Sequence, residues 1–149
     1  MNDDLRELYQ EVILDHNKRP RNRGRIEVPT AEADGHNPLC GDQVHVTLHT
    51  KDGLIDAIAF EGQGCAISTA SASLMTEAVK GKTVEEAEAI FREFQSMVTS
   101  PDDAGEHVDL GSLVVLAGVR EFPVRIKCAT LPWHTLHAAL AGERKVSTE

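Results

Sequence analysis

The residues most able to do chemistry are three cysteines, Cys40, Cys65 and Cys128. The thiolate form of cysteine binds metal ions and accepts sulfur. An odd number of cysteines cannot form a complete set of disulfides within one chain. The N-terminus shows no basic start followed by an apolar block, so no export signal is visible and a cytoplasmic location is expected. In that reducing compartment cysteines are more often metal ligands or reactive thiols.

The sequence predicts that each cysteine lies at the boundary of an element. Cys40 precedes a predicted strand, Cys65 follows the next strand and precedes a helix, and Cys128 starts the last helical region. A hairpin between the two strands returns the chain, so Cys40 and Cys65 are expected at the same end of the sheet. A helix N-terminus favours the thiolate, because its dipole and free N–H groups stabilise negative charge.

An aspartate completes a candidate ligand set. Asp42 follows Cys40 by two residues and can direct a carboxylate to the same point. Three thiolates and one carboxylate form a tetrahedral set suited to Zn²⁺, with distances of about 2.3 Å to sulfur and about 2.0–2.2 Å to oxygen. The spacing contains no C-x-x-C pair, so three small buried cysteines are the alternative interpretation. Among the histidines, only His36 is considered close to this set.

Hydrophobic periodicity predicts the elements that would position these residues. Strands are expected over 43–50 and 54–60, with a weaker strand near 31–33, and the Asp-Gly pair at 52–53 indicates a hairpin. Helices are expected over 3–16, 67–80, 83–97 and 110–119, and a last helical stretch is expected to begin after Pro123 and run to about 141, with a new start or a kink at Pro132. Strands before helices predict an α+β fold, with an antiparallel sheet of about three strands, helices packed on one face and the metal site at one end of the sheet.

Length and composition limit the classes of function. The 149 residues fit one domain, 1–149, with a frayed tail over 142–149. No apolar run approaches the roughly 20 residues of a membrane span, so no membrane association is expected. The net charge of −9 argues against general nucleic-acid binding.

One stretch, 18–25, runs against this acidic balance, because it contains five cations and no acid: Lys18, Arg19, Arg21, Arg23 and Arg25. It is interpreted either as a solvated loop or as a docking patch for an acidic partner surface.

Four segments occur in a characteristic order along the chain. They are LYQEVILDH at 8–16 with PRN at 20–22, NPLCGD at 37–42, GQGCAIS at 62–68 and RIKCATL at 125–131. Together they resemble the U-type iron–sulfur assembly proteins, which include IscU, SufU and the N-terminal domain of NifU. The resemblance covers nearly the whole chain and implies the same compact α+β fold.

Two departures from the IscU pattern make the chain most similar to the SufU branch. Lys127 stands where IscU-type proteins carry a histidine, and the stretch between Cys65 and Cys128 is longer. The resemblance implies a zinc protein that takes persulfide sulfur from a SufS-type cysteine desulfurase and passes it to downstream iron–sulfur assembly proteins. Its enzymatic activity is at most that of a zinc-dependent sulfurtransferase. The implied zinc ligands are Cys40, Asp42, Cys65 and Cys128, with Cys40 as the sulfur acceptor.

Two alternatives stay open at this stage. The same ligands could hold iron in a scaffold that assembles and transfers a [2Fe–2S] cluster. The chain could instead be a non-catalytic binding module whose zinc is structural.

Arg125 and Lys127 flank Cys128 and either offset the surplus negative charge of the site or are surface cations.

Overall fold

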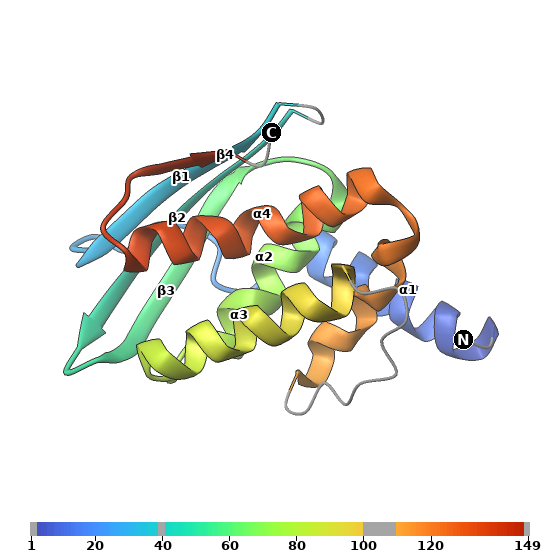
Figure 1. The fold of residues 1–149 in the computed structure, drawn as a ribbon, viewed down its shortest axis with the longest axis horizontal. Coiled ribbons are helices and arrows are strands. Elements are labelled where there is room, and N and C mark those ends of the chain that lie inside the picture. The colour runs from blue at the N-terminus through green and yellow to red at the C-terminus, as the bar shows by residue number, and fades with distance from the viewer. Residues whose placement is uncertain (1–2, 39–40, 100–109, 148–149) are drawn as a thin grey trace.

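The computed structural model of the protein describes residues 3–38, 41–99 and 110–147. In chain order its elements are α1 (Asp3–Lys18), β1 (Ala31–Asn37), β2 (Asp42–Lys51), β3 (Leu54–Gln63), α2 (Ala66–Val79), α3 (Val84–Thr99), the 3₁₀ helix η1 (Gly111–Glu121), α4 (Pro123–Leu140) and β4 (Lys145–Ser147). The strands form one sheet in the order β3-β2-β1-β4, and the helices cover one of its faces (Figure 1). The predicted α+β fold is therefore confirmed.

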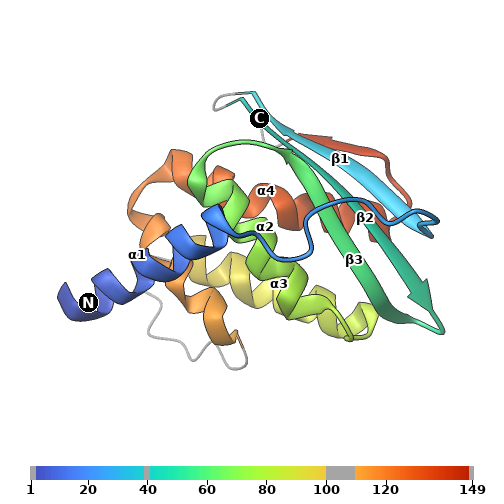
Figure 2. The same ribbon diagram turned by 180° about the vertical axis from the view of Figure 1, so that it is seen from behind.

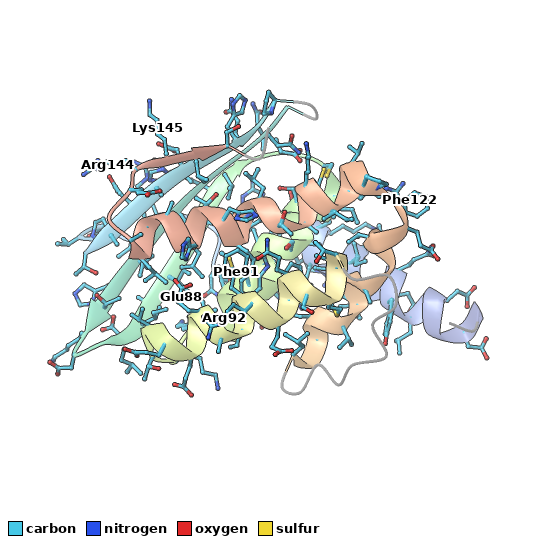
Figure 3. The ribbon with its side chains drawn as sticks, in the orientation of Figure 1. Glu88, Phe91, Arg92, Phe122, Arg144 and Lys145 are labelled. Carbon is cyan, nitrogen blue, oxygen red and sulfur yellow. The ribbon has the colours of Figure 1, made fainter. Side chains whose placement is uncertain are left out.

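The sheet differs in detail from the prediction because it contains a fourth, parallel strand. After α4 the chain returns along β1, where the backbone N–H of Asp34 donates to the carbonyl of Arg144 at 2.8 Å. Gly35 then pairs with Val146 in parallel register. The segment 142–149 was expected to fray, but residues 145–147 are held by this pairing. Figure 3 labels Arg144 and Lys145, where the chain enters the edge strand β4.

Alternation along β2 explains how the sheet packs. Val44, Val46 and Leu48 are buried in the core shared with the helices. Thr47 belongs to the opposite face, yet it is also buried. Its hydroxyl accepts the backbone N–H of Ile26 at 2.9 Å, so the segment that contains Ile26 covers it. The segment between α1 and β1 therefore lies against the face of the sheet that the helices leave open (Figure 2).

The outer edge of the sheet at β3 is paired with backbone from two other segments. Phe60 donates its N–H to the carbonyl of Asn22 at 3.1 Å and accepts the N–H of Gly24 at 2.7 Å. Ile55 donates to the carbonyl of Lys82 at 2.8 Å and accepts the N–H of Gly81 at 2.7 Å. These contacts tie the loops after α1 and α2 to the sheet.

The helical layer packs around an aromatic group between α3 and α4. Trp133 is fully buried, with ring centroids 4.9 Å from Phe94 and 6.0 Å from Phe91, which Figure 3 labels. The last helix continues through Pro132, so the new start expected there does not occur. Across the described ranges, none of the helices combines the length and apolar character needed to cross a bilayer.

Candidate metal centre

Three of the four predicted ligands meet at one end of the sheet. Asp42 is the first residue of β2, and Cys65 lies just after β3. Cys128 was expected at the start of the last helix, but it lies inside α4, which already begins at Pro123. Their ligand atoms are all within 4.8 Å of one another. Two sulfurs bound to one zinc ion at about 2.3 Å are at most about 4.6 Å apart, so the three side chains are already close to the spacing that one ion requires.

The carboxylate of Asp42 is held in place by the loop that carries Cys65. Asp42 is fully buried, and its Oδ1 accepts the backbone N–H of Cys65 at 2.9 Å. Its Oδ2 lies 3.8 Å from the Cys65 sulfur. Gly64 allows this close approach, because a Cβ at that position would lie only 2.7 Å from Oδ1. One carboxylate oxygen is thus used for positioning and the other faces the sulfur.

Cys65 occupies the N-cap of α2, as the sequence predicts. Its backbone is extended, and its sulfur accepts the N–H of Ser68 at 3.4 Å. The residue is exposed, whereas Asp42 and Cys128 are buried. An N–H donor and the positive end of a helix both stabilise negative charge on sulfur. The candidate centre is therefore open to solvent on the Cys65 side and closed on the Cys128 side.

Cys128 is contacted by a residue that sequence reasoning missed. The side-chain amide of Asn37 donates to the Cys128 sulfur across 3.9 Å, and Asn37 is fully buried. Asn37 ends β1 and pairs directly with Asp42 in the antiparallel register. A signal for it in the sequence is its place at the start of the NPLCGD segment, five residues before Asp42.

Among the described residues, this group does not include the predicted site residues Arg125 and Lys127. Cys40 lies outside the described residues. The guanidinium of Arg125 is exposed and lies 4.8 Å from the ring centroid of Phe122, which Figure 3 labels at the start of α4. Lys127 is half-buried. No ion pair joins Arg125 or Lys127 to Asp42 in the described part of the chain, so their charge-balancing role stays a prediction.

Three of the five cations in the 18–25 stretch form ion pairs or hydrogen bonds with acidic residues of the same chain. Arg21 and Arg19 pair with Asp15 at 2.7 and 3.5 Å, and Arg25 donates to Glu61 at 2.6 Å. The hydrogen bond from Arg21 lowers the pKa of Asp15 below its usual range. His36, considered near the site in the sequence, is an exposed residue of β1. These contacts favour a structural role for Arg19, Arg21 and Arg25.

A second feature missed by sequence reasoning is a buried polar contact between α1 and α2. His16 is 5% exposed, and its Nδ1 lies 2.7 Å from the Ser73 hydroxyl, which also accepts the backbone N–H of Arg21 at 2.8 Å. Burial lowers the pKa of His16, and the charge of Arg21 acts in the same direction, while Glu77 and Asp15 oppose them. The first segment of the family resemblance therefore fastens α1 to the helix that begins after Cys65.

The chemistry of the donor set fits zinc. Two thiolates and a carboxylate oxygen are ligand types that Zn²⁺ accepts in tetrahedral sites, and Asp42 is oriented by a backbone donor as such ligands commonly are. The same thiolates also suit iron–sulfur clusters, so the ligand atoms alone do not distinguish a zinc site from an iron–sulfur cluster site.

Comparison with known proteins places these residues in a wider context. Residues 8–129 match the family described as NifU-like N terminal domain. The chain is 42% identical to the zinc-dependent sulfurtransferase SufU of Bacillus subtilis (strain 168), over 95% of both chains. It is 44% identical to the iron–sulfur cluster assembly scaffold protein IscU of Streptococcus pyogenes serotype M1, over 91% of this chain and 84% of that protein. A crystal structure of a putative iron–sulfur cluster assembly scaffold protein for the SUF system from Fervidobacterium islandicum AW-1 superposes with a TM-score of 0.83, at 35% identity, over 90% of this chain and 97% of that one.

Proposed function

Because the chain belongs to the family of NifU-like N-terminal domains, we propose that it serves iron–sulfur cluster assembly as a zinc-bound sulfur acceptor. In this role it takes persulfide sulfur from a cysteine desulfurase and passes it to a downstream assembly protein. The observation that carries the proposal is the convergence of Asp42, Cys65 and Cys128 at one end of the sheet. The near full-length similarity to a protein named a zinc-dependent sulfurtransferase supports the choice of metal and activity.

The proposed zinc ligands are Cys40, Asp42, Cys65 and Cys128. Bound zinc would keep the thiols ionised and protect them from oxidation. The buried pair, Asp42 and Cys128, would form the fixed side of the site, since each is held by a hydrogen bond to a neighbouring element. The exposed side, marked by Cys65, is where a partner would approach.

Sulfur transfer in this proposal is a thiol exchange. The Cys40 thiolate attacks the outer sulfur of the persulfide on the desulfurase cysteine. A new sulfur–sulfur bond forms on Cys40, the sulfur–sulfur bond of the donor breaks, and the donor cysteine leaves as a thiolate. Cys40 then carries the sulfur as a persulfide, and the same exchange with a downstream thiol would release it.

The proposal is tested with the purified protein, its cysteine desulfurase and free cysteine. We expect the protein to raise desulfurase turnover, labelled sulfur to appear on Cys40, and the C40A variant to lose both effects. Elemental analysis of protein purified without added metal is expected to give about one zinc per chain and no iron, the occupancy of a single four-ligand site. No rise in turnover, or an unaffected C40A variant, would overturn the proposal.

A second candidate function is a scaffold that builds and transfers a [2Fe–2S] cluster. It is favoured by the 44% identity to a protein named an IscU scaffold. Anaerobic reconstitution with iron and sulfide separates the two functions. A stable, stoichiometric cluster seen by visible absorption supports the scaffold, whereas zinc that resists replacement by iron supports the sulfur acceptor.

A further inference from the structure

Asn37 is a polar residue in a place where an apolar one would normally be expected. It is fully buried at the end of β1, beneath α4 and beside the candidate metal centre. Burying a side-chain amide is costly unless its hydrogen-bonding groups are paired. An explanation for its presence must therefore come from the groups that it contacts.

The contact that bears on chemistry is the one with Cys128. The amide nitrogen Nδ2 of Asn37 faces the Cys128 sulfur at 3.9 Å, and both residues are buried. The –NH₂ end of an asparagine side chain is a donor only, so it favours a thiolate over a neutral thiol at this position. It also draws electron density from the sulfur, which reduces the charge that three thiolates and a carboxylate would concentrate on one ion.

The position of Asn37 is fixed by the sheet. Asn37 pairs with Asp42 across the β1–β2 ladder, so the amide and the candidate carboxylate ligand come from directly opposed residues. One short piece of ladder therefore sets both the Asp42 ligand and the donor to Cys128. Cys65 differs, because its donor is the backbone N–H of Ser68 and the residue is exposed.

We propose that Asn37 is a positioning residue whose amide holds Cys128 as a metal-bound thiolate, so that Cys128 stays on the metal while the site exchanges sulfur. This inference rests on the proposed zinc site. It assigns to Asn37 no contact with the sulfur that is transferred. Its consequence is that the donor character of Asn37, rather than its volume, controls how tightly the site holds its metal.

The test compares two variants of Asn37 with a matched control. N37D keeps the size of the side chain but replaces the donor with an acceptor, and N37A removes the polar group. The control is S71A, because the Ser71 hydroxyl donates to the backbone carbonyl of Ala129, next to Cys128, at 2.5 Å. Each protein is titrated with zinc against a chromophoric chelator, and the metal-free forms are compared by circular dichroism and thermal unfolding.

We expect N37D and N37A to raise the zinc dissociation constant by about 10–100-fold, the range found when hydrogen bonds to metal ligands are removed, and S71A to leave it unchanged. In the cobalt-substituted protein the thiolate-to-cobalt charge-transfer band should move to lower energy in both Asn37 variants. A residue that only supports the fold would lower the stability of the metal-free protein without moving this band.

Each other outcome decides against the inference. Zinc affinity and cobalt spectra of N37D equal to those of the unmodified protein would overturn it, and so would failure of both variants to fold, which would make the role structural. If the unmodified protein itself does not bind zinc through Cys65 and Cys128, the proposed function fails first. If it binds zinc and the variants bind equally well, only the role of Asn37 fails.

Discussion

Replacing Gly64 with alanine is expected to weaken metal binding without unfolding the protein. A Cβ at this position would lie 2.7 Å from Oδ1 of Asp42 and 3.1 Å from its Cγ. The carboxylate cannot turn away easily, because it is fully buried and Oδ1 accepts the N–H of Cys65 at 2.9 Å. Turning it would leave that donor without its partner. The backbone of Gly64 is not in the left-handed region, so the effect comes from the added methyl group itself.

The size of the effect follows from the packing. Forcing one methyl group into a closely packed site costs about 1–3 kcal/mol. The metal-free loop can relax to reduce this cost, whereas the metal-bound form needs Asp42 and Cys65 together, so we assign the cost to binding. On that basis the zinc dissociation constant rises roughly 5–150-fold.

The assay is competition for zinc with a chromophoric chelator, with G118A as the control. Gly118 lies in η1, and a Cβ there would meet no atom within 4 Å, so G118A should bind zinc like the unmodified protein. Unchanged zinc affinity in G64A would refute the reasoning, because it would show that the loop yields without cost. A fall in the stability of metal-free G64A that matches the loss of affinity would place the effect on the fold instead of the site.

Three further outcomes are expected. Burial lowers the pKa of His16 below its ordinary value of 6.5, so as the pH falls the unfolded chain binds the proton before the folded protein does. The free energy of unfolding should therefore fall as the pH falls through about 6.5. Urea denaturation at several pH values measures this, and the free energy of unfolding of H16N should depend less on pH. F94A removes a fully buried ring stacked on Trp133 and should lower the free energy of unfolding by about 3–5 kcal/mol in the same assay, unlike a substitution at an exposed position. Charge reversal at the exposed cations Lys18 and Arg23 should slow association with the desulfurase in surface-plasmon measurements and reduce its salt dependence, and unchanged kinetics would show that the 18–25 stretch is not a docking patch.

The elements that position the site could be predicted because their signals are local. Alternating residues in β2 and the Asp-Gly turn marked the hairpin, and the glycine before Cys65 marked the junction with α2. These signals predicted Cys40 and Cys65 at the same end of the sheet, and Asp42 was expected to direct its carboxylate to the same point. The spacing of the cysteines alone did not establish that Cys128 joins them; the family resemblance implied it.

What could not be predicted depends on contacts between distant segments. β4 has only three residues and shows no periodic pattern, so its pairing with β1 is visible only once α4 has been packed. His16 looked like one more residue of an amphipathic helix, because nothing in its own segment reveals Ser73 of α2. Asn37 was overlooked for the same reason, since its contact with Cys128 joins residues 91 positions apart.

The pairing of the β3 edge has a consequence for how the molecule resists self-association. An exposed outer strand offers free N–H and C=O groups onto which another chain can add a strand. In β3, the backbone N–H and C=O groups of Phe60 are hydrogen-bonded to Asn22 and Gly24, and those of Ile55 are hydrogen-bonded to Lys82 and Gly81. These four hydrogen bonds occupy part of the edge to which another strand would add, so loosening the loop after α1 is expected to expose Phe60 and promote self-association.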